Sequence, residues 1–370
     1  MEPQSSNSQI PQQNLPQPHR VSRKRFFLIG GVLFIVALTV LIGRVTLTFE
    51  RVSKGKGVVF ENEEDAGFTP HKDSDRVNVL LMGLRGVDDP EGGLLTDAMT
   101  VASLKKSTKE AALISIPRDV WVRMPGKKTY DKINAAYALG FEEGGSASAL
   151  AYAKAVAEKV TGLSLDGAVS VDIQALRDFI DAVGGITLTL ERPFTENRQW
   201  VRGGDMGTST AFIIETYTVT SADGIATETA KWVFELPKGT QVLNGTTALY
   251  YIRARFSSND FDRARREQQV LVALGTKLKS RGTLLNPFAL NELLKAFERN
   301  VETDMSPKRI LELASFASGI AARTVQKIIL SDDETGLLQT KHQNGVYTLV
   351  PRTGNFEEIR KMSREVFAEK

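Results

Sequence analysis

The sequence predicts an α/β domain that follows one N-terminal membrane-spanning helix. Residues 26–43 form an uninterrupted apolar run, FFLIGGVLFIVALTVLIG, of about the length that a bilayer requires. From residue 77 onward, short apolar runs typical of buried strands alternate with segments whose apolar residues recur at helical spacing. We find no internal repeat and no linker after residue 75, so we expect one domain over 76–370.

The segment before the apolar run predicts the orientation of the chain. Residues 1–19 are rich in Gln, Pro, Ser and Asn and have almost nothing to bury, so we expect residues 1–25 to be a disordered tail. Basic residues directly before a span keep the preceding segment in the cytoplasm. Four of them stand here, namely Arg20, Arg23, Lys24 and Arg25.

A cleaved signal peptide is the alternative interpretation of the apolar run. Its apolar region is usually shorter and ends in a small-x-small site, whereas this run continues into RVTLTFERV. We therefore predict a retained transmembrane anchor over 26–47 and an extracytoplasmic linker over 48–75. The chain would be a single-pass protein of the cell membrane, with its tail in the cytoplasm and its large domain outside.

Composition excludes several classes of site. The chain has 370 residues, 42% hydrophobic and 25% charged, which is enough to bury a full core. It has no cysteine, which excludes disulfides, zinc–thiolate sites and thiol nucleophiles. The only histidines are His19, His71 and His342, so any metal would be a hard cation on carboxylates, such as magnesium. A net charge of +3 is too balanced to indicate nucleic-acid binding.

Periodicity predicts the order of elements in the domain. Strands are expected at 77–84, 98–104, 110–116, 167–172 and 186–191, with a hairpin turn at LKKSTKE and one or two further hairpins over 208–236. Helices are expected at 132–140, 146–160, 173–185, 244–255, 260–280, 286–297 and 306–317, and the stretch 345–367 predicts a strand, a turn and a last helix.

ISIPRDVWV places an arginine and an aspartate where a strand ends. The strand is expected to end at Ile116, and Pro117 enforces an extended entry into the loop. Ligands of open α/β sheets bind at such strand ends, so Arg118 and Asp119 are candidate site residues. The alternative is a loop arginine that pairs with a loop aspartate.

GLLTDAMTV places Asp97 at the start of a strand. A glycine-rich loop that holds Asp88, Asp89 and Glu91 comes directly before it. Carboxylates gathered at strand ends supply the oxygen ligands that magnesium prefers. The alternative is that Asp97 caps a turn.

Lys132, in YDKINAAYALG, is predicted at the start of a helix. A lysine there has the wrong sign for the helix dipole, which favours anions at the N-terminus. This conflict indicates that Lys132 serves a bound anion. An ordinary exposed lysine is the alternative.

NDFDRARREQQ concentrates arginine on one helix. If the helix starts near Asp260, with Asp260 as its N-cap, Arg263 and Arg266 are three residues apart and share a face. Arg253 and Arg255 belong to the preceding element. Four guanidinium groups brought together repel one another unless an anion lies among them, and arginine binds phosphate bidentately. The pattern predicts a site for two or more phosphates, with a solvated helix face as the alternative.

Taken together, TDAMTVASL, SIPRDVWV, DKINAAYA, the RAR doublet and DFDRARR, in this order behind one anchor, resemble the LytR-CpsA-Psr family. The resemblance covers about residues 75–280 and continues more faintly through NVETDMSP and LVPRTGNFEEI. Members are bacterial cell-wall ligases that transfer glycopolymers from a polyprenyl-diphosphate carrier to peptidoglycan. The resemblance implies a mixed central sheet flanked by helices, with an apolar tunnel for the lipid tail between them.

The resemblance also implies roles for individual residues. Asp97 corresponds to a magnesium ligand, Asp260 to the acidic residue beside the arginines, and Lys132 to the lysine of the DKIN-like stretch. The arginines that hold the pyrophosphate in the family correspond to Arg118, Arg253, Arg255, Arg263 and Arg266.

The chain departs from the family pattern directly after the first strand. Family members commonly carry a GxD motif there, whose aspartate is the second metal ligand, whereas this chain has Arg85. Either Asp88 or Asp89 supplies the carboxylate, with Asp89 our candidate metal ligand beside Asp97, or Arg85 neutralises phosphate in place of part of the metal.

A second departure lies on the arginine-rich helix. Glu267 stands where glutamine is usual, and two glutamines follow it. The register there can slip by one residue, so Gln268 and Gln269 are both candidates for the family's glutamine.

The reaction that the resemblance implies is phosphoryl transfer. A peptidoglycan hydroxyl attacks the sugar-linked phosphorus, polyprenyl phosphate leaves, and the arginines stabilise the charge. Asp119 or Asp260 accepts the proton of the hydroxyl. Two other functions stay open: a module that binds the lipid-linked glycan without turnover, and a hydrolase that admits water to the same phosphate. A nucleic-acid partner is disfavoured by the exported location.

Overall fold

The computed structural model describes residues 68–84, 93–197, 211–220, 226–254 and 256–368. Within these ranges, no helix combines the length and the apolar composition that a membrane span needs. The predicted tail, the anchor over 26–47 and most of the linker lie outside the described residues, so these boundaries stay predictions.

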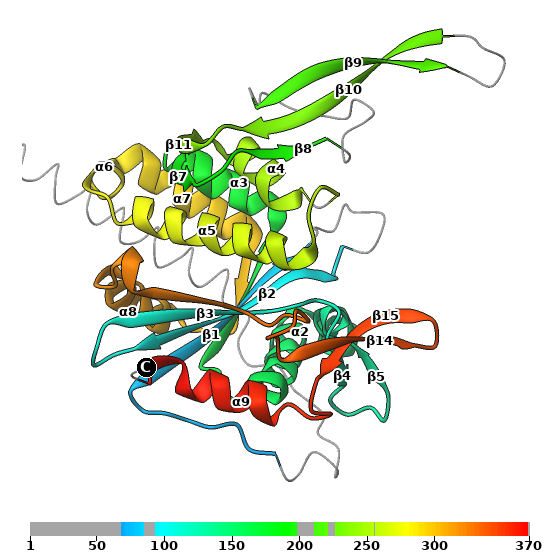
Figure 1. Ribbon diagram of the computed structural model, residues 1–370. Coiled ribbons are helices and arrows are strands. Elements are labelled where there is room, and N and C mark those ends of the chain that lie inside the picture. Colours follow the sequence, from blue (N-terminus) through cyan, green and yellow to red (C-terminus); the bar gives the residue numbers. More distant parts are fainter. Residues whose placement is uncertain (1–67, 85–92, 198–210, 221–225, 255, 369–370) are drawn as a thin grey trace, which may run out of the picture. The chain divides into compact units, whose positions relative to one another are not determined.

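Strands and helices follow one another largely in the predicted order (Figure 1). The described strands are β1 (Arg76–Leu84), β2 (Thr96–Lys105), β3 (Glu110–Ile116), β4 (Trp121–Arg123), β5 (Tyr130–Lys132), β6 (Gly167–Asp172), β7 (Ile186–Leu190), β8 (Phe194–Glu196), β9 (Phe212–Thr220), β10 (Ala226–Leu236), β11 (Gly239–Leu243), β12 (Val301–Thr303), β13 (Val325–Ile329), β14 (Leu338–Gln343) and β15 (Val346–Pro351). The described helices are α2 (Ala136–Thr161), α3 (Ile173–Ala182), α4 (Gly245–Arg253), α5 (Asp260–Leu278), α6 (Arg281–Leu284), α7 (Pro287–Asn300), α8 (Pro307–Ser318) and α9 (Glu357–Arg364), together with the 3-10 helices η2 (Ile133–Ala135), η3 (Ala322–Thr324) and η4 (Glu365–Phe367).

The central sheet is mixed, as expected, with the strand order β12-β6-β1-β2-β3-β13. β1, β2 and β3 form an antiparallel meander, in which the predicted turn joins β2 to β3. β6 is parallel to β1, and β13 is parallel to β3. Parallel pairs need long crossover connections, and helices supply them here.

One face of the sheet packs on α2 and α9, which lie together on the lower side of the sheet in Figure 1. Leu80, Val101 and Ile114 are fully buried in this core, because alternate strand residues point to the same face. The two helices predicted over 132–160 are the two halves of α2. They meet at a kink at Gly144 and Gly145, where the backbone leaves helical geometry. Glycine tolerates the φ of 69° found at Gly145.

A second core joins α3, α4 and α5 to the small sheets β7–β11 and β8–β10–β9. α3 ends at Ala182, and the predicted glycines, Gly184 and Gly185, follow with positive φ before β7 begins. The expected hairpin over 208–236 is present as β9 and β10, which pair antiparallel from Phe212 to Thr220.

Strand geometry brings the predicted motifs to one edge of the sheet. β2 and β3 are antiparallel neighbours and Met99 pairs with Ile116, so the start of β2 lies beside the end of β3. Asp97 and Arg118 belong to those two ends. The C-terminal hairpin β14–β15 reaches the same edge, where Leu349 N–H donates to Asp119 O at 2.9 Å.

Candidate active site

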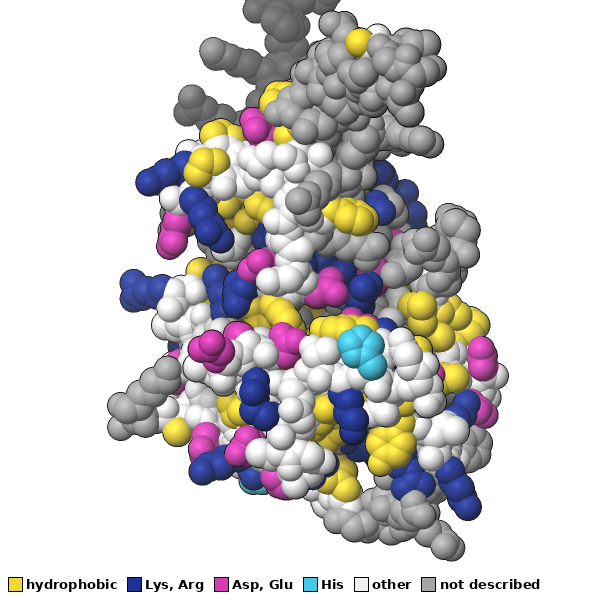
Figure 2. Space-filling model, turned by 45° about the vertical axis from the view of Figure 1, so that its right-hand side comes forward, with side chains coloured by type: hydrophobic (Ala, Val, Ile, Leu, Met, Phe, Trp, Pro, Cys, Tyr) yellow, Lys and Arg dark blue, Asp and Glu magenta, His cyan; other side chains and the backbone are white. Residues whose placement is uncertain are grey.

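A cavity of about 520 Å³ opens at this edge of the sheet. Its walls come from the ends of β2, β3 and β13, from the loop before α5, from the first two turns of α5 and from β15. Figure 2 shows side chains of both charge signs close together in the hollow between the helices and the sheet. Segments that are distant in the sequence therefore meet in one charged depression.

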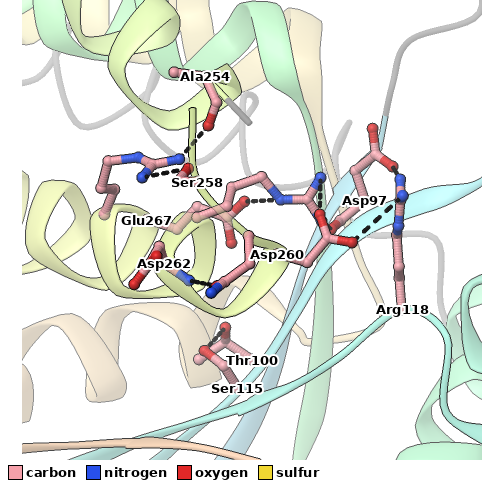
Figure 3. A network of polar contacts seen from close by, with 12 residues as sticks. Asp97, Thr100, Ser115, Arg118, Ala254, Ser258, Asp260, Asp262 and Glu267 are labelled. Carbon is pink, nitrogen blue, oxygen red and sulfur yellow. Dashed lines mark hydrogen bonds and ion pairs between the residues drawn. The ribbon is translucent and has the colours of Figure 1, made fainter. Parts of the chain in front are cut away.

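Arg118 forms ion pairs with several carboxylates, of which those to Asp97 and Asp260 are drawn in Figure 3. Its guanidinium is 3.1 Å from Asp97, 3.5 Å from Asp119 and 3.6 Å from Asp260. Burial alone would lower the pKa of Arg118, but the three carboxylates outweigh it and raise the pKa. Arg118 is therefore a fixed cation held by three elements, and the proposed loop pair with Asp119 is one part of that arrangement.

Arg263 is the second arginine of the cavity. It is buried on α5, its Nη2 donates to Asp97 O at 3.1 Å, and it forms ion pairs with Asp260 at 3.4 Å and with Glu267 at 3.6 Å. The Nε atoms of Arg118 and Arg263 are buried and have no hydrogen-bond partner. Each of these Nε atoms faces a carboxylate at ion-pair distance, Asp119 at 3.5 Å for Arg118 and Glu267 at 3.6 Å for Arg263, so both guanidinium groups are compensated in charge but are short of hydrogen bonds.

Asp260 has a different role from the N-cap that the sequence predicts. Asn259 is the N-cap of α5, and its side chain accepts from Asp262 N–H at 2.8 Å. This frees the Asp260 carboxylate, which sits between Arg118 and Arg263. The prediction of Asp260 as N-cap is wrong by one residue, because either Asn or Asp can cap and the sequence offers both side by side.

Lys132 is held by Asp119 at 2.6 Å, and Asp119 is buried. Lys132 is the last residue of the short strand β5 and also the N-cap of η2, so it stands at a helix start as predicted. Its ammonium group balances the charge of Asp119.

Glu267 is a half-buried acid in the cavity wall, with 17% of its side chain exposed. Burial raises the pKa of Glu267 to about 7, and the neighbouring Asp97 and Asp260 act in the same direction, while Arg263 opposes them. A glutamate at this position therefore adds a group that changes its charge near neutral pH.

Residues 45–365 match the sequence profile of the LytR_cpsA_psr family. The chain belongs to the LytR-CpsA-Psr family. A relative from Oceanobacillus iheyensis, the polyisoprenyl-teichoic acid–peptidoglycan teichoic acid transferase TagU, is 26% identical over 94% of this chain and 95% of its own length. The crystal structure of Bacillus subtilis TagV covers 80% of this chain and 99% of TagV with a TM-score of 0.55 at 24% identity. A structure of TagT bound to LI-WTA covers 79% of this chain and 90% of TagT, with a TM-score of 0.53 at 22% identity.

Arg266 is another arginine of the predicted pyrophosphate site. Arg266 is buried and does not line the cavity; it donates to Tyr251 O at 2.8 Å, to Ser258 Oγ at 3.1 Å and to Ala254 O. Its guanidinium also lies 4.9 Å from the ring centroid of Phe194. These contacts anchor the loop between α4 and α5, which carries part of the cavity wall.

Other predicted residues of the LytR-CpsA-Psr pattern lie apart from the cavity or outside the described residues. Arg253 is exposed at the end of α4 and does not line the cavity. The amide nitrogen of Gln268 donates to Ser115 Oγ at 2.9 Å and to Ile328 O at 3.0 Å, so Gln268 joins α5 to the sheet. Three residues lie outside the described residues, namely Arg85, Asp89 and Arg255.

The carboxylates of the site have the right chemistry for magnesium, which usually takes one or two carboxylates together with substrate phosphates and water. Asp97 fits that requirement at the cavity wall. Within the described ranges, no cluster of three acidic or histidine side chains is arranged to hold a metal by itself. A metal here would therefore depend on oxygen atoms of the substrate.

Sequence reasoning did not identify two aromatic residues of the cavity, Phe256 and Tyr347. Phe256 follows the RAR doublet directly and could have been noticed from that position. Tyr347 is 250 positions after Asp97 and reaches the cavity only through the β14–β15 hairpin, so no local pattern could have indicated it.

Proposed function

We propose that this cavity transfers a glycopolymer from a polyprenyl-diphosphate carrier to a hydroxyl group of peptidoglycan. The observation that carries the proposal is the pair of cavity-lining arginines, the half-buried Arg118 and the buried Arg263, whose guanidinium groups converge on the same carboxylate, Asp260. Forked guanidinium groups suit the non-bridging oxygens of a diphosphate. The relative from Oceanobacillus iheyensis is named for transfer of teichoic acid to peptidoglycan, which supports this reaction class.

The reaction is a phosphoryl transfer in which one phosphorus–oxygen bond replaces another. The acceptor oxygen bonds to the phosphorus that carries the sugar, and the bond from that phosphorus to the bridging oxygen breaks. Polyprenyl monophosphate leaves, and the product is a phosphodiester between polymer and peptidoglycan. Because such transition states are loose, positioning and charge stabilisation by Arg118 and Arg263 supply most of the catalysis.

We propose that Asp260 is the general base that accepts the proton of the attacking hydroxyl. Its side chain is 37% exposed, whereas the side chain of Asp119 is 10% exposed and is held by Lys132. A general base must reach the proton that it accepts, and Asp260 stands at the open side of the arginine pair.

The charge balance of the site favours a bound cation. Two arginines and a lysine face four carboxyl groups, so a diphosphate needs added positive charge. The groups are Arg118, Arg263 and Lys132 against Asp97, Asp119, Asp260 and Glu267. We propose that magnesium, held by Asp97 and the diphosphate, supplies this charge, and that Asp89 or Arg85 completes the site. When bound, the ion would neutralise the phosphate oxygens.

We further propose that the apolar run at 26–47 anchors the chain, which would place the cavity on the side of the membrane where peptidoglycan is built. A hydrophobic anchor also keeps the domain close to a lipid-linked substrate, which raises the local concentration of that substrate.

Product analysis tests the proposal. The full chain in detergent is incubated with a short-chain polyprenyl-diphosphate glycan and peptidoglycan oligomers, with and without magnesium, and products are identified by mass spectrometry. We expect a phosphodiester-linked product that requires magnesium and is lost in Arg118→Ala. Free polymer phosphate would identify a hydrolase, and intact bound substrate would identify a binding module; either result overturns the proposal.

A further inference from the structure

Two aromatic side chains line the cavity and yet are largely open to water. Phe256, in the loop between α4 and α5, is 53% exposed, and Tyr347, on β15, is 40% exposed. Of the exposed large apolar side chains in the described part of the chain, these are the two that line the cavity. Apolar surface gathered at the mouth of a polar cavity is typical of a ligand-binding surface.

The ring of Tyr347 is held in a defined position relative to the charged groups. His342 lies opposite Tyr347 in the β14–β15 register, and their rings meet edge to face with centroids 6.1 Å apart. Lys132 Nζ lies 6.0 Å from the Tyr347 ring centroid and also pairs with Asp119. Two residues along the same strand, Leu349 bonds to the backbone of Asp119. The hairpin is thus fastened to the residue next to Arg118.

The chemistry of the cavity limits what these rings can bind. A diphosphate offers no apolar surface and belongs with the arginines. A lipid tail is apolar on all sides, and rings that are 40% and 53% exposed would leave it in water. A hexopyranose has one apolar C–H face and a polar rim of hydroxyl groups, so it can cover an aromatic ring while its edges stay hydrated.

We propose that Tyr347, together with Phe256, binds the sugar unit that is joined to the diphosphate, and that the β14–β15 hairpin selects which sugar is accepted. The proposal rests on the proposed function, because it takes the diphosphate to lie at Arg118 and Arg263. Tyr347 makes and breaks no bond; it holds the sugar so that the attached phosphorus faces the arginines.

The test compares two ligands that differ only in the sugar. The full chain in detergent is titrated with farnesyl diphosphate that carries one N-acetylglucosamine and with farnesyl diphosphate whose terminal phosphate is methylated, so that the two lipids have the same charge. We expect the wild type to bind the glycosylated lipid more tightly. Tyr347→Ala should weaken binding of the glycosylated lipid about fivefold to tenfold and change binding of the methylated lipid less than about twofold. Tyr347→Phe keeps the ring and should keep both affinities.

Two further variants complete the test. Tyr130→Ala is the matched control, since Tyr130 is 54% exposed on β5 and does not line the cavity, and it should leave both affinities unchanged. Phe256→Ala should repeat the sugar-dependent loss, because Phe256 also lines the cavity.

Equal weakening of both ligands in Tyr347→Ala would overturn the proposal, because the ring would then contact the lipid or only support the fold. Equal wild-type affinity for the two lipids would also overturn it, because no sugar site would exist. Failure of the wild type to bind either lipid would instead refute the proposed function, and this inference with it.

Discussion

Arg263 and Arg266 lie three residues apart on α5, but their side chains have different partners. Arg263 lines the cavity, and its guanidinium forms ion pairs with the carboxylates of Asp260 and Glu267. Arg266 is buried to a similar degree, but its nitrogen atoms donate to the backbone of α4 and to Ser258. The same side chain on the same helix therefore lines the cavity in one case and holds a loop in the other, and the difference lies in the acceptors that surround it.

The acceptors of Arg266 explain why it is held. Tyr251 O and Ala254 O lie in the last turn of α4 and directly after it, where carbonyl groups lack helical partners and the helix dipole is negative. The rings of Phe194 and Tyr251 lie against the guanidinium at 4.9 and 5.7 Å. Burial lowers the pKa of Arg266, whereas the carboxylates around Arg118 raise the pKa of Arg118.

The largest expected effect is on stability. Arg266→Ala should lower the free energy of unfolding by about 3 kcal/mol, because it leaves buried carbonyl groups without donors. Denaturant unfolding of the full chain measures this. Arg265→Ala is the matched control. Arg265 is exposed and forms an ion pair with Asp262 on the same helix, so its loss should change stability by less than about 0.5 kcal/mol. If the Arg266→Ala protein keeps its stability but fails to bind lipid diphosphate, then Arg266 serves the phosphate site and does not hold the loop.

The next largest effect is expected on the rate of glycopolymer transfer. Arg263→Ala should slow glycopolymer transfer about a hundredfold, equivalent to about 2.7 kcal/mol of transition-state stabilisation, because it removes a guanidinium from the phosphate site. Single-turnover rates with saturating substrate measure the effect. The Arg263→Ala variant should lose less unfolding free energy than the Arg266→Ala variant. If the transfer rate of Arg263→Ala stays within twofold of the wild type, Arg263 does not serve the phosphate.

A smaller effect depends on pH and on Glu267. Its folded-state pKa of about 7 lies above its ordinary value of 4.5, so the stability that its protonated form contributes is present at low pH and is lost as pH rises through about 7. Wild-type unfolding free energy should fall by on the order of 2 kcal/mol between pH 5.5 and 8 through this group. Glu267→Gln should remove that part of the pH dependence. Identical pH profiles for wild type and Glu267→Gln would show that Glu267 does not titrate in this range.

Local patterns were sufficient to predict much of the sheet and part of the site. The β2–β3 hairpin follows from two apolar runs and a polar turn, and it alone brings Asp97 to Arg118. The start of α5 follows from its capping residues to within one position, which decides whether Asp260 caps the helix or pairs with the arginines. The concentration of arginines indicated a site for two or more phosphates, and the family pattern specified the diphosphate of a lipid carrier.

Long-range contacts account for what the sequence did not predict. A spacing of three placed Arg263 and Arg266 on one helix face, but side-chain length lets Arg266 reach the end of α4 instead of the cavity. Tyr347 enters the cavity because β15 is fastened to Asp119, a contact between residues more than two hundred positions apart. Neither arrangement has a local signal, because each depends on how separate elements pack.

The most direct test of the account is the single-turnover transfer rate of Arg118→Lys beside that of Arg265→Lys. Both substitutions keep a positive charge, so the carboxylates around position 118 stay compensated, but only the first removes a guanidinium fork from the cavity. We predict that Arg118→Lys is slower by about tenfold to a hundredfold and that Arg265→Lys stays within about twofold of the wild type. An Arg118→Lys protein that transfers glycopolymer at the wild-type rate would contradict the claim that arginine forks in this cavity stabilise the transferred phosphate.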